Sequence, residues 1–212
     1  MSKLCAGAAL AALLIAAPAA RADEPIAQAG DFLVRARGIV VTPDEGATIT
    51  PIGGDVKIST TTMPEVDFSY FVTDNIAFEL IAAVARHDVT AIGTSLGDVP
   101  LGDLLLLPPT LTVQYHLPVT DDFKPYVGAG VNYTFFIDED AAGGAVTRLR
   151  AKDSFGWALQ AGFDYRISGP FLFNADVKRL FLDSRASVNG GAIRADVTID
   201  PWIFGIGVGY RF

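Results

Sequence analysis

The chain has 212 residues, of which 50% are hydrophobic and 19% are charged, with 16 basic against 24 acidic side chains. This composition is too apolar for an ordinary water-soluble domain, and an acidic excess without a basic cluster excludes a nucleic-acid partner. The single cysteine excludes a disulfide scaffold and a thiolate zinc site, whereas 21 glycines and 14 phenylalanines favour β-structure.

The first 22 residues have the pattern of a cleaved export signal. Lys3 precedes an apolar run over residues 4–20, and the triplet Ala20-Arg21-Ala22 has the small residues that signal peptidase accepts, so cleavage is expected after Ala22. An uncleaved membrane anchor is the alternative, since the run is about long enough to cross a bilayer. Residues 23–212 are expected to form one domain, without a second apolar stretch of about 18 residues that would make a transmembrane helix.

Short alternating segments fill the rest of the chain. Apolar residues recur at every second position, which is the pattern of a strand with one apolar face. Eight strands are predicted, at residues 31–42, 56–72, 76–90, 106–118, 124–137, 153–167, 170–186 and 194–212. Short turns are expected at 73–75, 120–123 and 168–169, and longer glycine- and aspartate-rich loops at 43–55, 91–105, 138–152 and near 189–191.

The two faces of these strands favour a transmembrane barrel. The last segment places Trp202, Phe204 and Ile206 on one face and glycines between them on the other. A soluble sandwich needs charged residues outside, whereas large aromatics suit lipid and glycine suits a narrow interior. We expect an all-β, eight-stranded antiparallel barrel in the outer membrane of a Gram-negative cell, with both termini periplasmic. A secreted β-sandwich is the alternative.

Side chains expected to point inward are polar in the periplasmic half of the barrel. Unpaired charges in so narrow a lumen are costly, so acids and bases are expected to pair in a polar floor that rigidifies the barrel. A proton or ion pathway is the alternative. The floor residues are Arg35, Asp67, Glu79, Gln114, Asp164, Asp176, Lys178 and Arg211.

Toward the exterior the inward positions become apolar. This lining predicts a funnel for a small hydrophobic solute, because an apolar mouth that faces water gains nothing unless it holds an apolar occupant. Hydrocarbon packed tightly in a narrow barrel is the alternative. The lining residues are Met63, Ile81, Ala83, Leu106, Phe136 and Leu180.

Prolines lie in the strands on either side of the third strand. Pro64 is in the second predicted strand, and Pro108 and Pro109 are in the fourth. Since proline cannot donate a ladder hydrogen bond, these positions predict either a lateral opening of the wall into the bilayer or bent strands at the membrane rim.

The chain ends in Tyr210-Arg211-Phe212. A terminal aromatic on the lipid-facing side resembles the signal that the outer-membrane assembly machinery reads, which makes Tyr210 and Phe212 candidate assembly residues.

Five segments, TDNIAFEL, LLPPTLTVQYH, PYVGAGVNYT, DSFGWALQAGFDY and DPWIFGIGVGYRF, resemble the OmpW/AlkL family of small outer-membrane proteins in the same order. The resemblance covers residues 31–212 and implies an eight-stranded barrel with a narrow hydrophobic channel, associated with uptake of small hydrophobic molecules. The channel wall would include Ile81, and Lys178 stands where some relatives place a large aromatic inside.

Two rival functions stay open beside passive transport. A structural or receptor barrel would bind colicin, phage or a host surface through the charged loop 138–152. An outer-membrane hydrolase would use His87 or His116, with Asp88 beside His87 and Thr90 or Ser95 as nucleophile. Neighbours on a strand point to opposite faces, so no enzyme is expected and His87 is interpreted as a membrane-interface residue.

No residue pattern in the sequence predicts a cofactor or a metal site. The expected partners are outer-membrane lipid and lipopolysaccharide, a small hydrophobic solute, and the outer-membrane assembly machinery.

Overall fold

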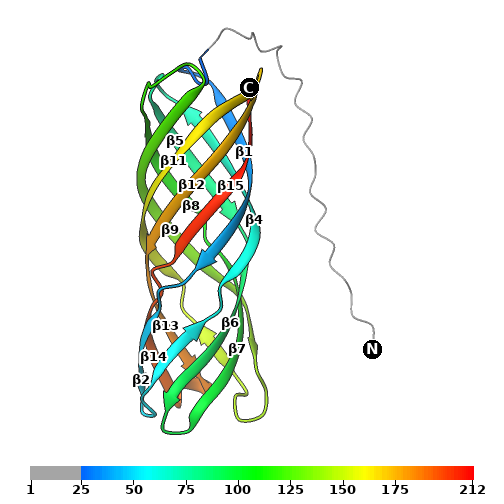
Figure 1. The fold of residues 1–212 in the computed structure, drawn as a ribbon. Helices are drawn as coiled ribbons and strands as arrows, with labels where there is room; N and C mark the ends of the chain where they lie inside the picture. Colours follow the sequence, from blue (N-terminus) through cyan, green and yellow to red (C-terminus); the bar gives the residue numbers. More distant parts are fainter. Residues whose placement is uncertain (1–24) are drawn as a thin grey trace, which may run out of the picture.

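The computed structural model describes residues 25–212, so the predicted export signal at 1–22 lies outside the described residues. Eight strands close into an antiparallel barrel in which each strand pairs with the next and the last pairs with the first (Figure 1). They are β1 (Phe32–Thr42), β4 (Thr61–Phe71), β5 (Ile76–Ala83), β8 (Thr110–His116), β9 (Phe123–Ala141), β11 (Ser154–Ser168), β12 (Phe171–Phe181) and β15 (Trp202–Arg211). The predicted eight-stranded antiparallel barrel is confirmed.

The outer face of the barrel is apolar, as the alternation predicts, whereas the inner face is polar or small in the periplasmic half and apolar toward the extracellular end. Along β15, Phe204 and Ile206 are exposed while Gly205 and Gly209 are buried. Trp157 on β11 is 62% exposed, and large exposed apolar side chains recur around the wall. Such a continuous apolar surface suits hydrocarbon and not water. Within residues 25–212, no helix has the length and apolarity that a membrane crossing requires.

Short connections and both ends of the described chain lie at the same end of the barrel. In Figure 1 this is the upper end, where the C-terminus and the start of β1 lie. The links from β4 to β5, from β8 to β9 and from β11 to β12 are the predicted short turns. Short turns and termini mark the periplasmic end of an outer-membrane barrel, so the opposite end is extracellular.

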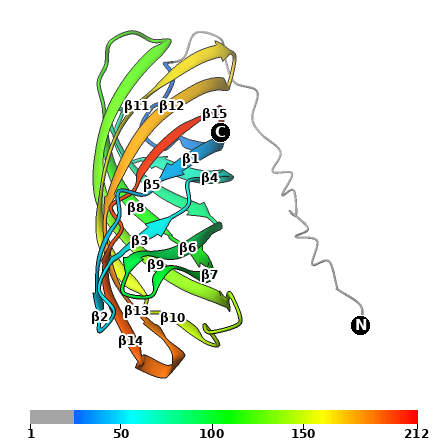
Figure 2. The same ribbon diagram turned by 60° about the horizontal axis from the view of Figure 1, so that its bottom comes forward.

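The extracellular end is built from further strands and not from the long loops that the sequence predicts. These strands are β2 (Gly46–Thr50), β3 (Asp55–Ile58), β6 (Ala85–Thr94), β7 (Gly97–Leu107), β10 (Leu149–Ala151), β13 (Asp183–Val188) and β14 (Ile193–Thr198), with the 3₁₀ turn η1 (Asn189–Gly191) between the last two. Figure 2, with this end turned forward, shows β2, β13 and β14 on one side and β6 and β7 on the other. The loop prediction for 91–105 is therefore wrong, and those for 43–55 and 138–152 hold only for the residues between the strands.

Glycine explains the difference, because it is common in loops and also occurs at bends within a hairpin. Gly97 and Gly102 have positive φ values of 82° and 133°, at the β6–β7 turn and at a register shift between the same two strands. Glycine at these points allows the chain to turn and the strand pairing to shift register while the hairpin continues. Several predicted strands are likewise each two strands in the structure: 56–72 contains β3 and β4, and 76–90 contains β5 and the start of β6.

Candidate functional site

A buried cluster of charged side chains closes the periplasmic half of the lumen. Arg35 on β1 is fully buried and lies at its centre. Its guanidinium contacts Asp164 on β11 through two nitrogens, at 3.0 and 2.7 Å, and Asp67 on β4 at 2.8 Å. Glu79 on β5 lies 3.5 Å away and accepts a hydrogen bond from Gln160 at 2.8 Å. Each of these carboxylates therefore has a cationic or amide partner, which is the condition for burying charge in a narrow space.

A second layer of ion pairs lies on the extracellular side of Arg35. Arg37 contacts Glu65 at 2.8 Å and Asp176 at 2.9 Å. Lys178 contacts the same two carboxylates, both at 2.8 Å. Arg37 and Glu65 are absent from the predicted floor, although their alternation was visible: Arg37 is two residues after Arg35, and Glu65 is two residues before Asp67.

The predicted floor residues do not all belong to one cluster. Gln114 on β8 is fully buried and hydrogen bonds with His116 at 2.9 Å. Arg211 lies apart from the cluster, at the periplasmic end, where it donates to the carbonyl of Pro25 and lies 3.3 Å from Asp31. Arg211 thus ties the start of the described chain to the last strand instead of forming part of the floor.

Glycines on the inner face make room for the long side chains of the floor. A Cβ added at Gly207 on β15 would meet the backbone of Ala36 first and would also lie 2.8 Å from Cγ of Arg37, and one at Gly128 on β9 would lie 2.9 Å from Cγ of Gln160. Both distances are too short for carbon atoms to tolerate. The glycine-rich inward face seen in the sequence therefore matches the charged residues opposite it.

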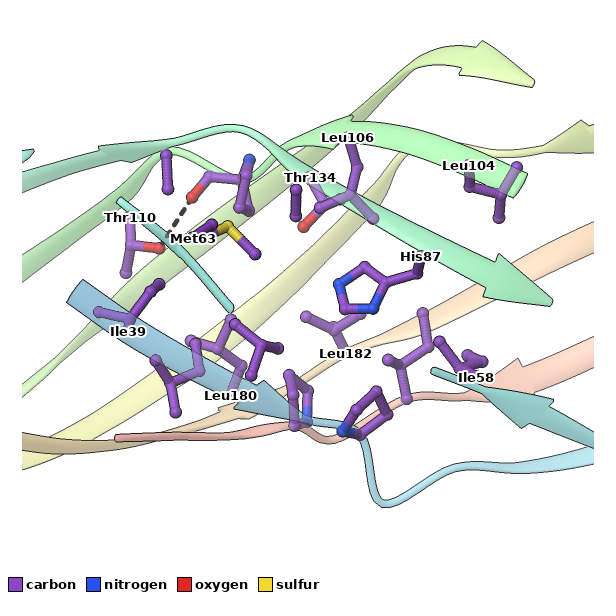
Figure 3. Close-up of a pocket in the computed structure, with 18 of the residues that line it drawn as sticks. Ile39, Ile58, Met63, His87, Leu104, Leu106, Thr110, Thr134, Leu180 and Leu182 are labelled. Carbon is purple, nitrogen blue, oxygen red and sulfur yellow. Dashed lines mark hydrogen bonds between the residues drawn. The ribbon is translucent and has the colours of Figure 1, made fainter. Parts of the chain in front are cut away.

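An apolar cavity of about 90 Å³ lies on the extracellular side of this floor, and Figure 3 draws residues that line it. All six predicted lining residues, Met63, Ile81, Ala83, Leu106, Phe136 and Leu180, are on its wall. Residues on other inward positions complete the wall, including Ile39, Val41, Leu182, Ile199 and Ile203. The void shows that the inward methyl groups of the extracellular half are not packed solid.

The two ends of the cavity differ in chemistry. At the periplasmic end the Glu65–Lys178 ion pair forms its base. At the extracellular end, Val89 and Leu104 line the cavity and also belong to a larger apolar cluster inside the strand extension. That cluster comprises Ile49, Val56, Val89, Ala91, Leu101, Leu104, Val146, Leu149, Val188 and Val197. Apolar side chains therefore continue from the cavity to the outer end of the molecule.

Pro108 and Pro109 separate β7 from β8, so their predicted place within a strand is wrong. The amide of Asn132 on β9 donates to both of their carbonyls at 3.2 Å, and the backbone amide of Tyr133 donates to the Pro109 carbonyl at 3.1 Å. These hydrogen bonds hold the segment between β7 and β8 against β9. Pro108 also lines the cavity.

Pro64 lies beside an interruption of the wall between β4 and β6. The β4–β5 ladder runs from Phe71 to Glu65, and the β3–β6 ladder runs from Ile58 to Asp55. Residues 59–64 and 84–88 lie between these two ladders, and the amide of Ser59 donates to the Asp88 carbonyl at the outer edge, at 3.0 Å. Met63 comes from this stretch and lines the cavity, so the cavity borders the interruption.

His87 points into the cavity, and its interpretation as a membrane-interface residue is wrong. It is 5% exposed, and its Nδ1 lies 2.7 Å from the backbone carbonyl oxygen of Ser59. Asp88 is exposed on the opposite face of β6, so the histidine–aspartate pair of the hydrolase hypothesis is not formed. Burial in this apolar setting lowers the pKa of the His87 imidazole.

Several known proteins are similar to this chain. The family model described as the OmpW family matches residues 28–212. Outer membrane protein W of Vibrio cholerae is 35% identical over 222 aligned positions, covering 100% of both chains. Dibenzothiophene metabolism operon protein PahQ of Pseudomonas aeruginosa is 30% identical and covers 76% of each chain.

Solved structures give the same relationship. The crystal structure of OprG from Pseudomonas aeruginosa matches with a TM-score of 0.80 and 36% identity, covering 87% of this chain and 97% of that one. The solid-state NMR structure of AlkL in lipid bilayers matches with a TM-score of 0.66 and 26% identity, covering 92% and 95%. The closed barrel, its apolar exterior and these full-length matches together show that the chain belongs to the OmpW family and is a β-barrel of the outer membrane.

Proposed function

We propose that the barrel is a passive route by which small hydrophobic molecules enter across the outer membrane. The observation that carries the proposal is the apolar cavity above an ionic floor. An apolar solute gains roughly 25 cal/mol for each Å² of apolar surface that it buries, and it gains nothing from the charged layer below. The operon name of the relative PahQ supports this class of solute, since dibenzothiophene is an apolar fused-ring compound.

The path that we propose leaves the barrel sideways. The floor blocks a straight descent, because an apolar solute would have to displace ion pairs of 2.7–2.9 Å between fully buried groups. The interruption beside Pro64 borders the cavity, and Val84 next to it is an exposed apolar residue, so we place the exit toward lipid at this point. A solute that leaves there passes from an apolar cavity into lipid without crossing a polar layer.

Outer-membrane lipid is thus the receiving phase of the proposed path. Lipopolysaccharide is a poor solvent for apolar molecules, and a protein path around its polar layer lowers that barrier. The same apolar exterior requires insertion by the assembly machinery, for which Tyr210 and Phe212 at the end of β15 are the proposed signal.

A charge placed in the cavity tests the proposed function. Ile81 is buried on the cavity wall, and Ile81→Lys puts an ammonium group where the solute would lie. Cells that carry this variant are expected to lose uptake of n-alkanes at an equal amount of folded barrel. Leu96→Lys is the matched control, because Leu96 is 68% exposed at the β6–β7 turn. Unchanged uptake in the Ile81 variant would show that the solute does not pass through the cavity.

The lateral exit is tested separately from binding. Pro64→Val restores a backbone N–H in β4, which favours continuation of the ladder across the interruption. We expect the variant to bind alkane in lipid nanodiscs as the original protein does, but to take it up more slowly in cells. Equal uptake rates would refute the exit beside Pro64 and leave the cavity itself in place.

A further inference from the structure

Five polar residues line the otherwise apolar cavity: Glu65, His87, Thr110, Thr134 and Lys178. Glu65 and Lys178 are paired with each other at 2.8 Å. The hydroxyl of Thr110 donates to the Pro108 carbonyl at 3.1 Å, the contact drawn in Figure 3. The hydroxyl of Thr134 donates to Oδ1 of Asn132 at 2.8 Å. These four side chains are thus engaged with the floor or the wall.

His87 differs from the other four in having an uncommitted polar atom. A carbonyl oxygen only accepts, so the 2.7 Å contact with Ser59 requires the proton on Nδ1. In the neutral ring, Nε2 is then a hydrogen-bond acceptor. Within residues 25–212 no hydrogen bond forms to this atom, and the side chain, 5% exposed overall, lines the cavity. Figure 3 shows the ring reaching into the cavity among Ile58, Leu104 and Leu182.

We infer that His87 Nε2 selects solutes that carry one hydrogen-bond donor, such as an alcohol, a phenol or a ring N–H, on an otherwise apolar body. This inference rests on the proposed function and names the preferred class of solute. An apolar occupant that covers this acceptor without bonding to it leaves it unpaired, which is costly, whereas a solute that donates to it avoids that cost while its apolar part fills the cavity. A pure alkane fills the cavity and leaves Nε2 unpaired.

The geometry also fixes the direction of the selectivity. The contact with Ser59 holds the tautomer, so the cavity presents an acceptor and no donor at this point. An ether of the same size can accept but cannot donate, so it should bind like an alkane. The contrast between an alcohol and an ether therefore separates recognition of a donor from a general preference for polar solutes.

The experiment uses three probes of equal heavy-atom number: 1-hexanol, pentyl methyl ether and n-heptane. The protein in lipid nanodiscs is titrated with each, at concentrations corrected for partition into lipid, and binding is followed by the methyl NMR signals of Met63 and Leu180. We expect 1-hexanol to bind about tenfold more tightly than the ether. His87→Phe keeps a ring of similar size and should make the two affinities equal, with n-heptane binding unchanged.

The ¹⁵N signal of the His87 ring gives a second readout that needs no variant. On binding 1-hexanol, the Nε2 resonance should shift as a nitrogen that accepts a hydrogen bond, and n-heptane should leave it in place. Binding of n-heptane with no advantage for 1-hexanol, or binding of 1-hexanol with no Nε2 shift, would overturn the inference and leave the proposed function standing. Failure of all three probes to perturb Met63 and Leu180 would overturn both.

Discussion

Replacing Arg35 with methionine removes the cation at the centre of the buried charge cluster while keeping an unbranched side chain. Asp67 would keep its contact with Arg37 at 2.9 Å. Asp164 would keep only the amide of Asn174 at 2.9 Å and His116 at 4.0 Å among the contacts found here. One fully buried carboxylate is then left without a cation. Breaking a buried pair in this way typically costs about 3–5 kcal/mol, which is the expected loss in the free energy of unfolding for Arg35→Met.

Urea titration of the barrel in lipid vesicles measures this loss. Trp157 and Trp202 both face the lipid, so their fluorescence reports the transfer from lipid to water on unfolding. Arg86→Met is the control for the same substitution: Arg86 is 48% exposed in an ion pair with Asp103 and Asp140, and no measurable change is expected there.

A double variant tests the cause of the loss. Arg35→Met combined with Asp164→Asn removes the orphaned charge together with its partner, so the double variant should be more stable than Arg35→Met alone. The reasoning is refuted if Arg35→Met unfolds at the same urea concentration as the original protein. It is equally refuted if the second substitution adds a further loss instead of a recovery.

Three further outcomes are expected. Gly207→Val should prevent folding, because its Cβ would meet the backbone of Ala36. Gly38→Ala should fold, because a Cβ at Gly38 meets nothing within 4 Å. Equal heat-modifiable gel shifts for the two variants would contradict the packing. Phe212→Ser should lower the amount of assembled barrel in cells more than Phe171→Ser, a lipid-facing change at the same end, and equal amounts would argue against a terminal signal. Burial lowers the pKa of His87, although the hydrogen bond to Ser59 and nearby Asp88 and Glu45 raise it, so the ring is still mostly neutral when the pH reaches the ordinary histidine pKa of about 6.5. The preference for 1-hexanol should therefore persist there and disappear only at lower pH, and its loss already at neutral pH would contradict a neutral acceptor.

The barrel and its division into two halves were predictable because the strand period is two. Once one inward residue of a strand is fixed, every second residue follows, and this rule alone predicts Ile81, Leu106 and Leu180 on the inner wall, where they line the cavity. The same rule placed Arg35 and Asp164 in the lumen on strands far apart in sequence. It did not say that they touch, since pairing depends on how the strands are staggered around the closed barrel.

The extracellular strands and His87 were not predictable in the same way. Glycine and aspartate in 91–105 indicate loop by local preference, and the apolar cluster that turns this segment into a hairpin forms only when residues from several distant segments meet. His87 has a polar ring on an inward position, and its role depends on the Ser59 carbonyl across the wall interruption. A contact between a side chain and a distant backbone carbonyl produces no repeating pattern in the sequence, so the sequence does not predict it.

The central claim is that an apolar solute occupies the cavity above the ionic floor. Photo-crosslinking with an alkyl diazirine on the barrel in native outer-membrane vesicles tests it directly. We expect labels on the side chains of Met63, Ile81 and Leu180 themselves, assigned residue by residue, and excess n-heptane should reduce them. Labels confined to lipid-facing residues such as Leu80 and Phe204, insensitive to n-heptane, would contradict it.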